Sequence, residues 1–186
     1  MKKTITTIAM LGMLLPGMAQ NVKTTFQTSS HWKPTIDVRA DAVMVYGTGS
    51  SPQISFQERV DSWRKQGYTT HFMTGIAWGG YSDYFTGKWD GKQHMDEGQK
   101  DMKGDTILHN PGTPYIVPTL NYLKYFKETQ LKPVIDAGIS DIFLEEPEFW
   151  AFAGYSESFK REWQDYYGFP WRAQHLSAEN TYLSNK

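Results

Sequence analysis

The 186-residue sequence contains no cysteine, which excludes disulfide bonds, a thiolate nucleophile, a cysteine-ligated metal and a lipidated N-terminal cysteine. It also lacks an excess of positive charge, since 19 Lys and Arg residues stand against 20 Asp and Glu residues and the formal net charge is -1. Binding of nucleic acid through bulk charge is therefore excluded. Beyond residue 20, no apolar run approaches the roughly 20 residues that span a bilayer, which excludes a protein with several membrane spans.

Apolar and aromatic residues are plentiful, at 39% and 15% of the chain, and indicate a globular protein with a packed core. The N-terminus has a different pattern. Lys2 and Lys3 precede an apolar stretch over residues 5–15, and Gly17-Met18-Ala19 forms a small-x-small cleavage site. This pattern predicts a secretory signal peptide over residues 1–19 and a bacterial protein that is periplasmic or secreted.

Short apolar runs alternate with amphipathic segments along the rest of the chain. Residues 20–40 form a polar N-terminal segment with little periodicity. Buried strands are predicted at Ala42–Tyr46, Thr70–Trp78, Tyr115–Thr119 and Asp141–Leu144. Helices are predicted between Ser55 and Gly67, over Leu120–Ala137 with a new turn or kink at Pro133, and between Ser156 and Gly168.

Four strands that alternate with helices predict an α/β fold with a parallel sheet and right-handed crossovers. A doubly wound sheet and a (β/α)8 TIM-type barrel are the two candidate architectures. The turn Gly47-Thr48-Gly49 matches neither nucleotide-binding glycine motif, whereas acids and tryptophans gather at the strand ends, as in a barrel. Because a full barrel takes about 250 residues, residues 41–186 are expected to form only its N-terminal half, with about four βα units.

The acidic segment after the fourth predicted strand is the strongest chemical signal. Glu145, Glu146 and Glu148 lie close together there, beside Trp150. Crowded carboxylates against aromatic walls raise one another's proton affinity, which suits a general acid that protonates a leaving oxygen. The alternative is a solvated loop whose acids precede the helix capped by Ser156.

This segment, with the downstream pattern from Phe159 to Trp171 (FKREW, then YGFPW), resembles the acid/base region of retaining glycoside hydrolases of clan A, in the β-galactosidase-like branch of these (β/α)8 enzymes. The resemblance implies that Glu146 is the acid/base residue. Glu145 stands where the clan has an asparagine that contacts a sugar hydroxyl. The clan's nucleophile, a glutamate at the end of strand seven, has no counterpart in four βα units, so these residues alone are expected to be inactive.

Further candidates for substrate binding lie at or near the ends of other strands. Trp78 and Trp89 are candidate stacking platforms, and His109 with Asn110 is placed to bond to substrate, although a turn role is the alternative. The long segment 81–112 that carries Trp89 is either a cleft wall or an ordinary surface loop. Neither a metal nor another cofactor is expected, because EF-hand spacing and a paired-histidine zinc motif are missing. Without a GxSxG elbow, a Ser-His-Asp esterase is not supported either.

These features predict an exported glycoside hydrolase that cleaves O-glycosidic bonds of oligo- or polysaccharides by carboxylate acid/base catalysis, with retention. Its expected partner is a carbohydrate substrate, with no nucleic acid and no membrane span. The first alternative is a non-catalytic carbohydrate-binding barrel protein. A metal-dependent hydrolase on the same barrel is a second alternative.

Overall fold

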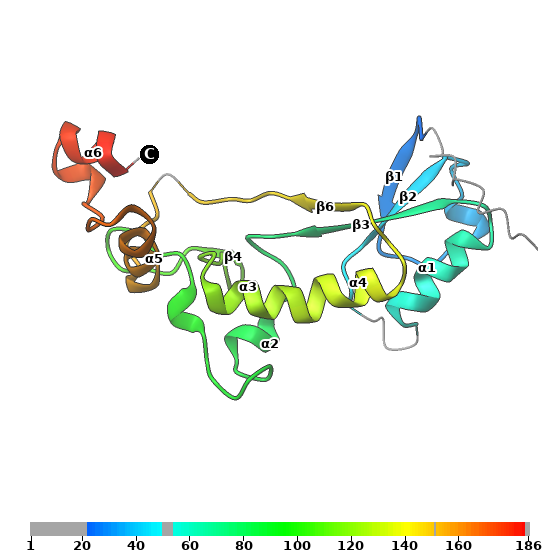
Figure 1. Ribbon diagram of the computed structural model, residues 1–186, viewed down its shortest axis with the longest axis horizontal. Coiled ribbons are helices and arrows are strands. Elements are labelled where there is room, and N and C mark those ends of the chain that lie inside the picture. Colours follow the sequence, from blue (N-terminus) through cyan, green and yellow to red (C-terminus); the bar gives the residue numbers. More distant parts are fainter. Residues whose placement is uncertain (1–21, 50–53, 151, 185–186) are drawn as a thin grey trace, which may run out of the picture.

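The computed structural model describes residues 22–49, 54–150 and 152–184, so the predicted signal peptide lies outside the described residues. Its main sheet has four parallel strands whose order across the sheet follows the chain: β1 (Thr25–Thr28), β2 (Ala42–Tyr46), β3 (Thr69–Gly75) and β6 (Ile142–Glu145) (Figure 1). The predicted α/β class with a parallel sheet is confirmed. Within the described residues the sheet is open, with β1 and β6 at its edges.

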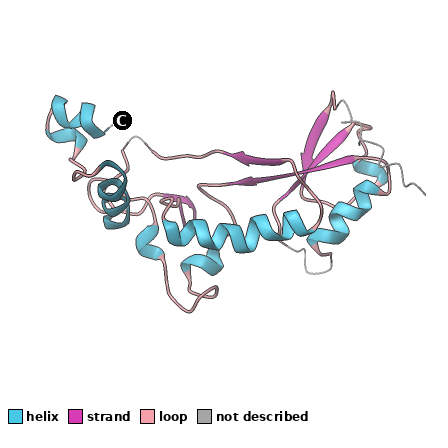
Figure 2. Ribbon diagram, viewed as in Figure 1, coloured by secondary structure: helices cyan, strands magenta, loops and turns pink. Residues whose placement is uncertain are grey.

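Helices follow the strands and also build the end of the molecule away from the sheet (Figure 2). The α-helices are α1 (Phe56–Arg64), α2 (Ser82–Phe85), α3 (Leu120–Phe126), α4 (Lys132–Asp136), α5 (Glu157–Tyr167) and α6 (Ala178–Ser184). Short 3-10 turns lie at η1 (Pro34–Ile36), η2 (Met95–Glu97) and η4 (Gln174–Leu176). None of the helices in these ranges has the length and apolar character needed to cross a membrane.

Three predicted helix boundaries follow directly from capping chemistry. Ser55 begins α1 with a complete capping box, in which its hydroxyl accepts from Glu58 N–H and the Glu58 carboxylate accepts from Ser55 N–H. The hydroxyl of Ser156 caps α5 by accepting from a single backbone N–H, that of Phe159, and Gly168 ends that helix in the left-handed conformation that glycine adopts without strain.

The predicted helix 120–137 contains a π-helical segment, η3 (Lys127–Leu131), between α3 and α4. Pro133 is the second residue of α4 and lacks the N–H that a regular α-helix would use. The wider turn just before it is a typical accommodation, and it matches the predicted change of turn at Pro133.

Two strand predictions need correction. Tyr115–Thr119 is not a strand of the sheet: Pro114 precedes it, Pro118 lies within it, and its N–H groups bond to carbonyls outside the sheet, such as Ile116 to Ala77 and Val117 to Glu97. The nearby strands are instead a short antiparallel hairpin, β4 (Leu108–Asn110) and β5 (Thr113–Pro114). Conversely, the N-terminal segment 20–40 contributes edge strand β1, which its mainly polar composition does not reveal.

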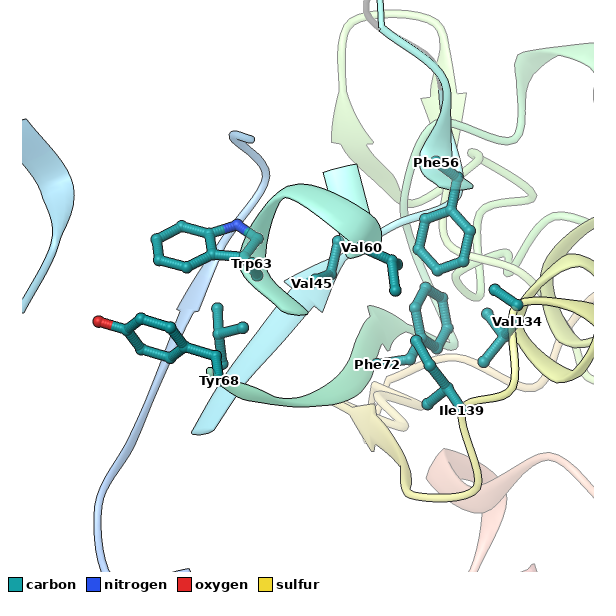
Figure 3. Packing of buried hydrophobic residues seen from close by; sticks show 10 residues of the cluster. Val45, Phe56, Val60, Trp63, Tyr68, Phe72, Val134 and Ile139 are labelled. Carbon is teal, nitrogen blue, oxygen red and sulfur yellow. The ribbon is translucent and has the colours of Figure 1, made fainter. Parts of the chain in front are cut away.

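The helices α1 and α4 cover one face of the sheet. Val45 of β2 and Phe72 of β3 pair in register and point to that face, where they meet Val60 of α1 and Val134 of α4, all with no exposed surface (Figure 3). Full burial of such side chains stabilises the fold by about 1.5–3 kcal/mol each. This cluster holds the sheet and its two covering helices together.

The opposite face of the sheet carries a different set of side chains. Side chains alternate along a strand, so Met44 and Tyr46 of β2, Met73 of β3, and Phe143 and Glu145 of β6 all point away from the α1 cluster. Met44 and Met73 are partly exposed, and Phe143 is 47% exposed. The described chain therefore covers this face incompletely.

Candidate functional site

A hollow lies at the carboxyl ends of the parallel strands. Its larger cavity, of about 920 Å³, is bounded by the segments that follow β2 and β3 and by the π-helical segment; a smaller one, of about 290 Å³, lies at the ends of β1, β2 and β6. The two cavities share Ser29, Tyr46 and Trp78 as lining residues, and we call them together the sheet-edge site. Loops at this end of parallel strands are where α/β proteins place their ligands.

The side chains of Tyr46 on β2 and Glu145 on β6 approach each other across β3, the strand between them. Tyr46 pairs with Met73, and Glu145 pairs with Gly75 two residues further along β3, so both side chains are on the same face. Gly75 has no side chain to separate them, and its N–H donates to the Tyr46 hydroxyl at 3.3 Å. Burial and the Glu145 carboxylate raise the pKa of Tyr46, so the phenol keeps its proton as a donor.

Trp78 forms the wall that both cavities share. The chain turns after β3 so tightly that a Cβ on Gly75 would lie 2.7 Å from the Trp78 carbonyl oxygen and 3.3 Å from its indole ring. The imidazole of His109 stacks on the indole with ring centroids 4.3 Å apart, and Asn110 Nδ2 donates to His109 Nδ1 at 2.6 Å. The predicted binding residues Trp78, His109 and Asn110 are therefore brought together in one place.

Arg59 fixes the loops that frame the site. This α1 residue is 3% exposed, and its guanidinium donates to the carbonyls of Ser29, Tyr46, Gly47 and Gly49 at 2.7–3.0 Å. Among the described residues it makes no ion pair. One buried side chain thus ties the ends of β1 and β2 to a covering helix.

The far wall of the larger cavity comes from the π-helical segment and α2. Thr48 donates to the carbonyl of Thr129 at 3.1 Å and to the side chain of Gln130 at 2.8 Å. Asp83 accepts from the Tyr125 hydroxyl at 2.6 Å, and burial together with this carboxylate raises the pKa of the phenol. The wall therefore presents hydroxyl, amide and carboxylate groups beside aromatic rings.

The rest of the predicted acid cluster follows Glu145 along the chain, outside the lining of the two cavities. Glu146 is exposed and has a φ of 47°, a left-handed conformation that is uncommon for a residue with a side chain. Glu148 and Trp150 both contact Tyr115, whose pKa is raised by burial and by the carboxylates of Glu148 and Glu146.

The side chain of Gln99 holds this acidic segment in place through hydrogen bonds. It has no exposed surface; its Nε2 donates to the carbonyls of Glu148 at 2.8 Å and Ile116 at 3.2 Å, and its Oε1 accepts from Trp150 N–H at 3.2 Å. All three bonds involve the backbone. The segment is thereby positioned by a residue of the long loop 81–112.

Trp89 lies away from the sheet-edge site and the acidic segment. It packs against Tyr84 and Tyr125 in a second core of aromatic residues, and its Nε1 donates to Glu128 at 3.1 Å. It is not among the residues that line the sheet-edge site. A stacking role for Trp89 stays a prediction that this placement does not favour.

Buried Glu97 organises the loop that carries Trp89. Its carboxylate accepts from Tyr84 and Thr119, and from Asn121 at 2.9 Å. His94 lies between two carboxylates, with Nδ1 3.3 Å from Glu97 and Nε2 3.2 Å from Asp90. Burial opposes ionisation of Glu97, but the hydrogen bonds of Asn121, Thr119 and Tyr84 outweigh it and lower the pKa.

The sequence predicted Glu145 and Trp78 at strand ends and named His109 and Asn110, just before a predicted strand, as candidates; it did not indicate Tyr46, Arg59 or Gln99. Tyr46 closes a strand, so its position alone could have marked it. Arg59 and Gln99 could not be recognised because their roles depend on long-range contacts. In the described ranges, no cluster of three or more His, Asp and Glu residues is arranged to hold a metal ion.

Comparison with known proteins finds no match. No protein-family model, no curated protein and no solved structure matches the chain. The functional conclusion therefore depends on the geometry of the sheet-edge site.

Proposed function

We propose that this protein binds carbohydrate in the sheet-edge site and hydrolyses a glycosidic bond there with carboxylates at the end of β6. The observation that carries the proposal is the juxtaposition of Trp78 with the Tyr46–Glu145 pair around one cavity. A flat indole packs against the apolar face of a sugar ring, while a carboxylate and a phenol bond to its hydroxyls. The hydroxyl and amide groups of Thr48 and Gln130 extend this pattern into the larger cavity.

The arrangement of the sheet supports the finer architecture, the first half of a (β/α)8 barrel. Strand order follows chain order without the reversal that marks a doubly wound sheet. Both α1 and α4 cover the same face, as the outer helices of a barrel do, whereas a doubly wound sheet has helices on both faces. The opposite face, with Met44, Tyr46, Met73 and Glu145, would then be the barrel interior.

The two glutamates at the end of β6 receive different roles. Glu145 lies in the site and would bond to a sugar hydroxyl beside the scissile bond, in the place of the asparagine of clan A. Glu146, the next residue, lies outside the cavity lining and would deliver the proton to a leaving oxygen at the edge of the site. Its left-handed backbone costs about 1 kcal/mol, and strain of this kind concentrates at functional positions. A retaining mechanism also needs a second carboxyl group about 5–5.5 Å from the first, from a strand additional to these four.

The test is hydrolysis of aryl glycosides and a panel of oligosaccharides by the full-length gene product and three variants. Glu146→Gln should lower turnover by about 10²–10⁴-fold, Glu145→Gln should weaken binding as well, and exposed Glu179→Gln is the matched control. Unchanged turnover in Glu146→Gln would refute its assignment as acid/base. Sugar binding that is lost in a further variant, Trp78→Ala, without turnover by the unmodified protein, would support the non-catalytic carbohydrate-binding alternative instead.

A further inference from the structure

A separate cavity of about 450 Å³ lies at the end of the molecule remote from the sheet, by α5 and α6 (Figure 1). Three segments that are distant in sequence build it, namely the loop 101–103, the chain just before α5, and the η4–α6 region. Tyr155 N–H donates to the carbonyl of Lys100 at 3.3 Å and joins the first two segments. We call this hollow the distal cavity.

The walls of the distal cavity combine fixed aromatic rings with polar groups. The Tyr155 hydroxyl hydrogen-bonds to His175 Nδ1 at 2.6 Å, and Trp171 packs edge-on against the Tyr155 ring at 4.8 Å. Phe152 lines the cavity and is 56% exposed. Gln174 and Thr181 add uncharged polar groups to the lining. This is the combination of ring faces and hydrogen-bonding groups that binds sugars.

A row of aromatic rings links the distal cavity to the sheet-edge site. From Trp78 the row passes to His109 at 4.3 Å, Tyr115 at 5.5 Å, Trp150 at 5.6 Å and Phe152 at 5.9 Å, measured between successive ring centroids. Trp78 lines the sheet-edge site, and Phe152 lines the distal cavity. Trp150 and Phe152 are carried by the stretch of chain that runs from β6 to α5 (Figure 1).

We propose that the distal cavity is a second carbohydrate-binding site that holds a remote part of the same chain whose reacting end occupies the sheet-edge site. The inference rests on the proposed function and narrows its substrate class to polysaccharides or long oligosaccharides. A small glycoside fills the sheet-edge site alone and gains nothing from Phe152, whereas a long chain contacts the row of rings and both cavities. Linked contacts of this kind raise affinity without altering either site.

The experiment measures dissociation constants by calorimetry for disaccharides and hexasaccharides of the cello-, xylo-, manno- and galacto- series. The full-length protein is compared with Phe152→Ala and His175→Ala, which alter the distal cavity, and with Tyr166→Ala, which removes an 81% exposed ring of α5 outside that cavity. We expect the unmodified protein to bind a hexasaccharide more tightly than the disaccharide of its series. Phe152→Ala should weaken hexasaccharide binding about tenfold and leave disaccharide binding unchanged.

His175→Ala should also weaken binding of the hexasaccharide, and Tyr166→Ala should bind both sugars with the affinity of the unmodified protein. Equal affinity for both lengths, or a Phe152→Ala protein that folds and binds the hexasaccharide normally, would overturn the distal site while leaving the proposed function intact. Failure of the unmodified protein to bind any sugar of either length would contradict the proposed function itself, and the inference with it.

Discussion

The Tyr46 phenol reaches the Glu145 carboxylate across Gly75, the residue of β3 that pairs with Glu145. Strand register puts both side chains on the face opposite α1, and the missing side chain at Gly75 lets them meet. The same glycine lies under the Trp78 turn. One residue without a side chain therefore permits both contacts on which the sheet-edge site depends.

Gly75→Ala should disturb the site more than it disturbs the fold. The added Cβ would lie 2.7 Å from the Trp78 carbonyl oxygen, a backbone atom that can move only with the whole turn. We expect a loss of about 1–3 kcal/mol in the free energy of unfolding, together with weaker sugar binding. Urea unfolding and calorimetry measure the two effects.

Gly80→Ala is the matched control for this substitution. It lies in the same turn, has no neighbour within 4 Å of the added Cβ, and needs no left-handed backbone. It should leave stability within about 0.5 kcal/mol of the unmodified protein. Equal behaviour of the two variants would argue against the close approach of Trp78 to β3.

Gln99→Glu should release the acidic segment while keeping the size of the side chain. The new carboxylate cannot donate to the Glu148 and Ile116 carbonyls and instead repels them in a buried position. The expected cost is about 1–3 kcal/mol in unfolding free energy, with greater quenching of tryptophan fluorescence by acrylamide as Trp150 loosens. Exposed Gln66→Glu is the control, and identical quenching of the two variants would contradict the positioning role of Gln99.

Acid should unfold the loop 81–112 through Glu97. The folded-state pKa of this carboxyl lies below its ordinary value of 4.5, so its stabilisation is fully present above that pH and is lost as pH falls through the lowered folded value. Glu97→Gln removes this dependence but keeps Asp90 and His94, the other titratable groups of the cluster.

The measurement is unfolding free energy from about pH 7 to about pH 3 for both proteins. The unmodified protein should be the more stable at neutral pH, and the difference should shrink below pH 4.5. A difference that stays constant over this range would show that Glu97 is not held as a stabilised carboxylate.

Local sequence patterns predicted the elements that local chemistry controls. The apolar stripe of Phe56, Val60 and Trp63 with its capping serine predicted α1 almost to its ends. Strand β1 was not predicted because it has a single apolar residue, Phe26, and therefore shows no alternation of apolar and polar residues. Tyr115–Thr119 looked like a strand because buried loops can be as apolar as buried strands, and only the location of their hydrogen-bond partners distinguishes them.

The candidate site was predictable to the extent that strand ends converge in a parallel sheet. That rule predicts that Glu145 and Trp78 lie at the same edge of the sheet. It could not reveal that Tyr46 meets Glu145, since this depends on a two-residue offset in register across Gly75. Nor could it place Gln99, which supports residues 49 and 51 positions further along the chain.

The most direct measurement is a crystal structure of the full-length Glu146→Gln variant, in which turnover is blocked, with the oligosaccharide that binds most tightly. The account predicts a sugar ring against Trp78, a hydroxyl within hydrogen-bond distance of the Glu145 carboxylate, and the glycosidic oxygen beside residue 146. A sugar bound elsewhere on the protein, with the sheet-edge site empty, would contradict it.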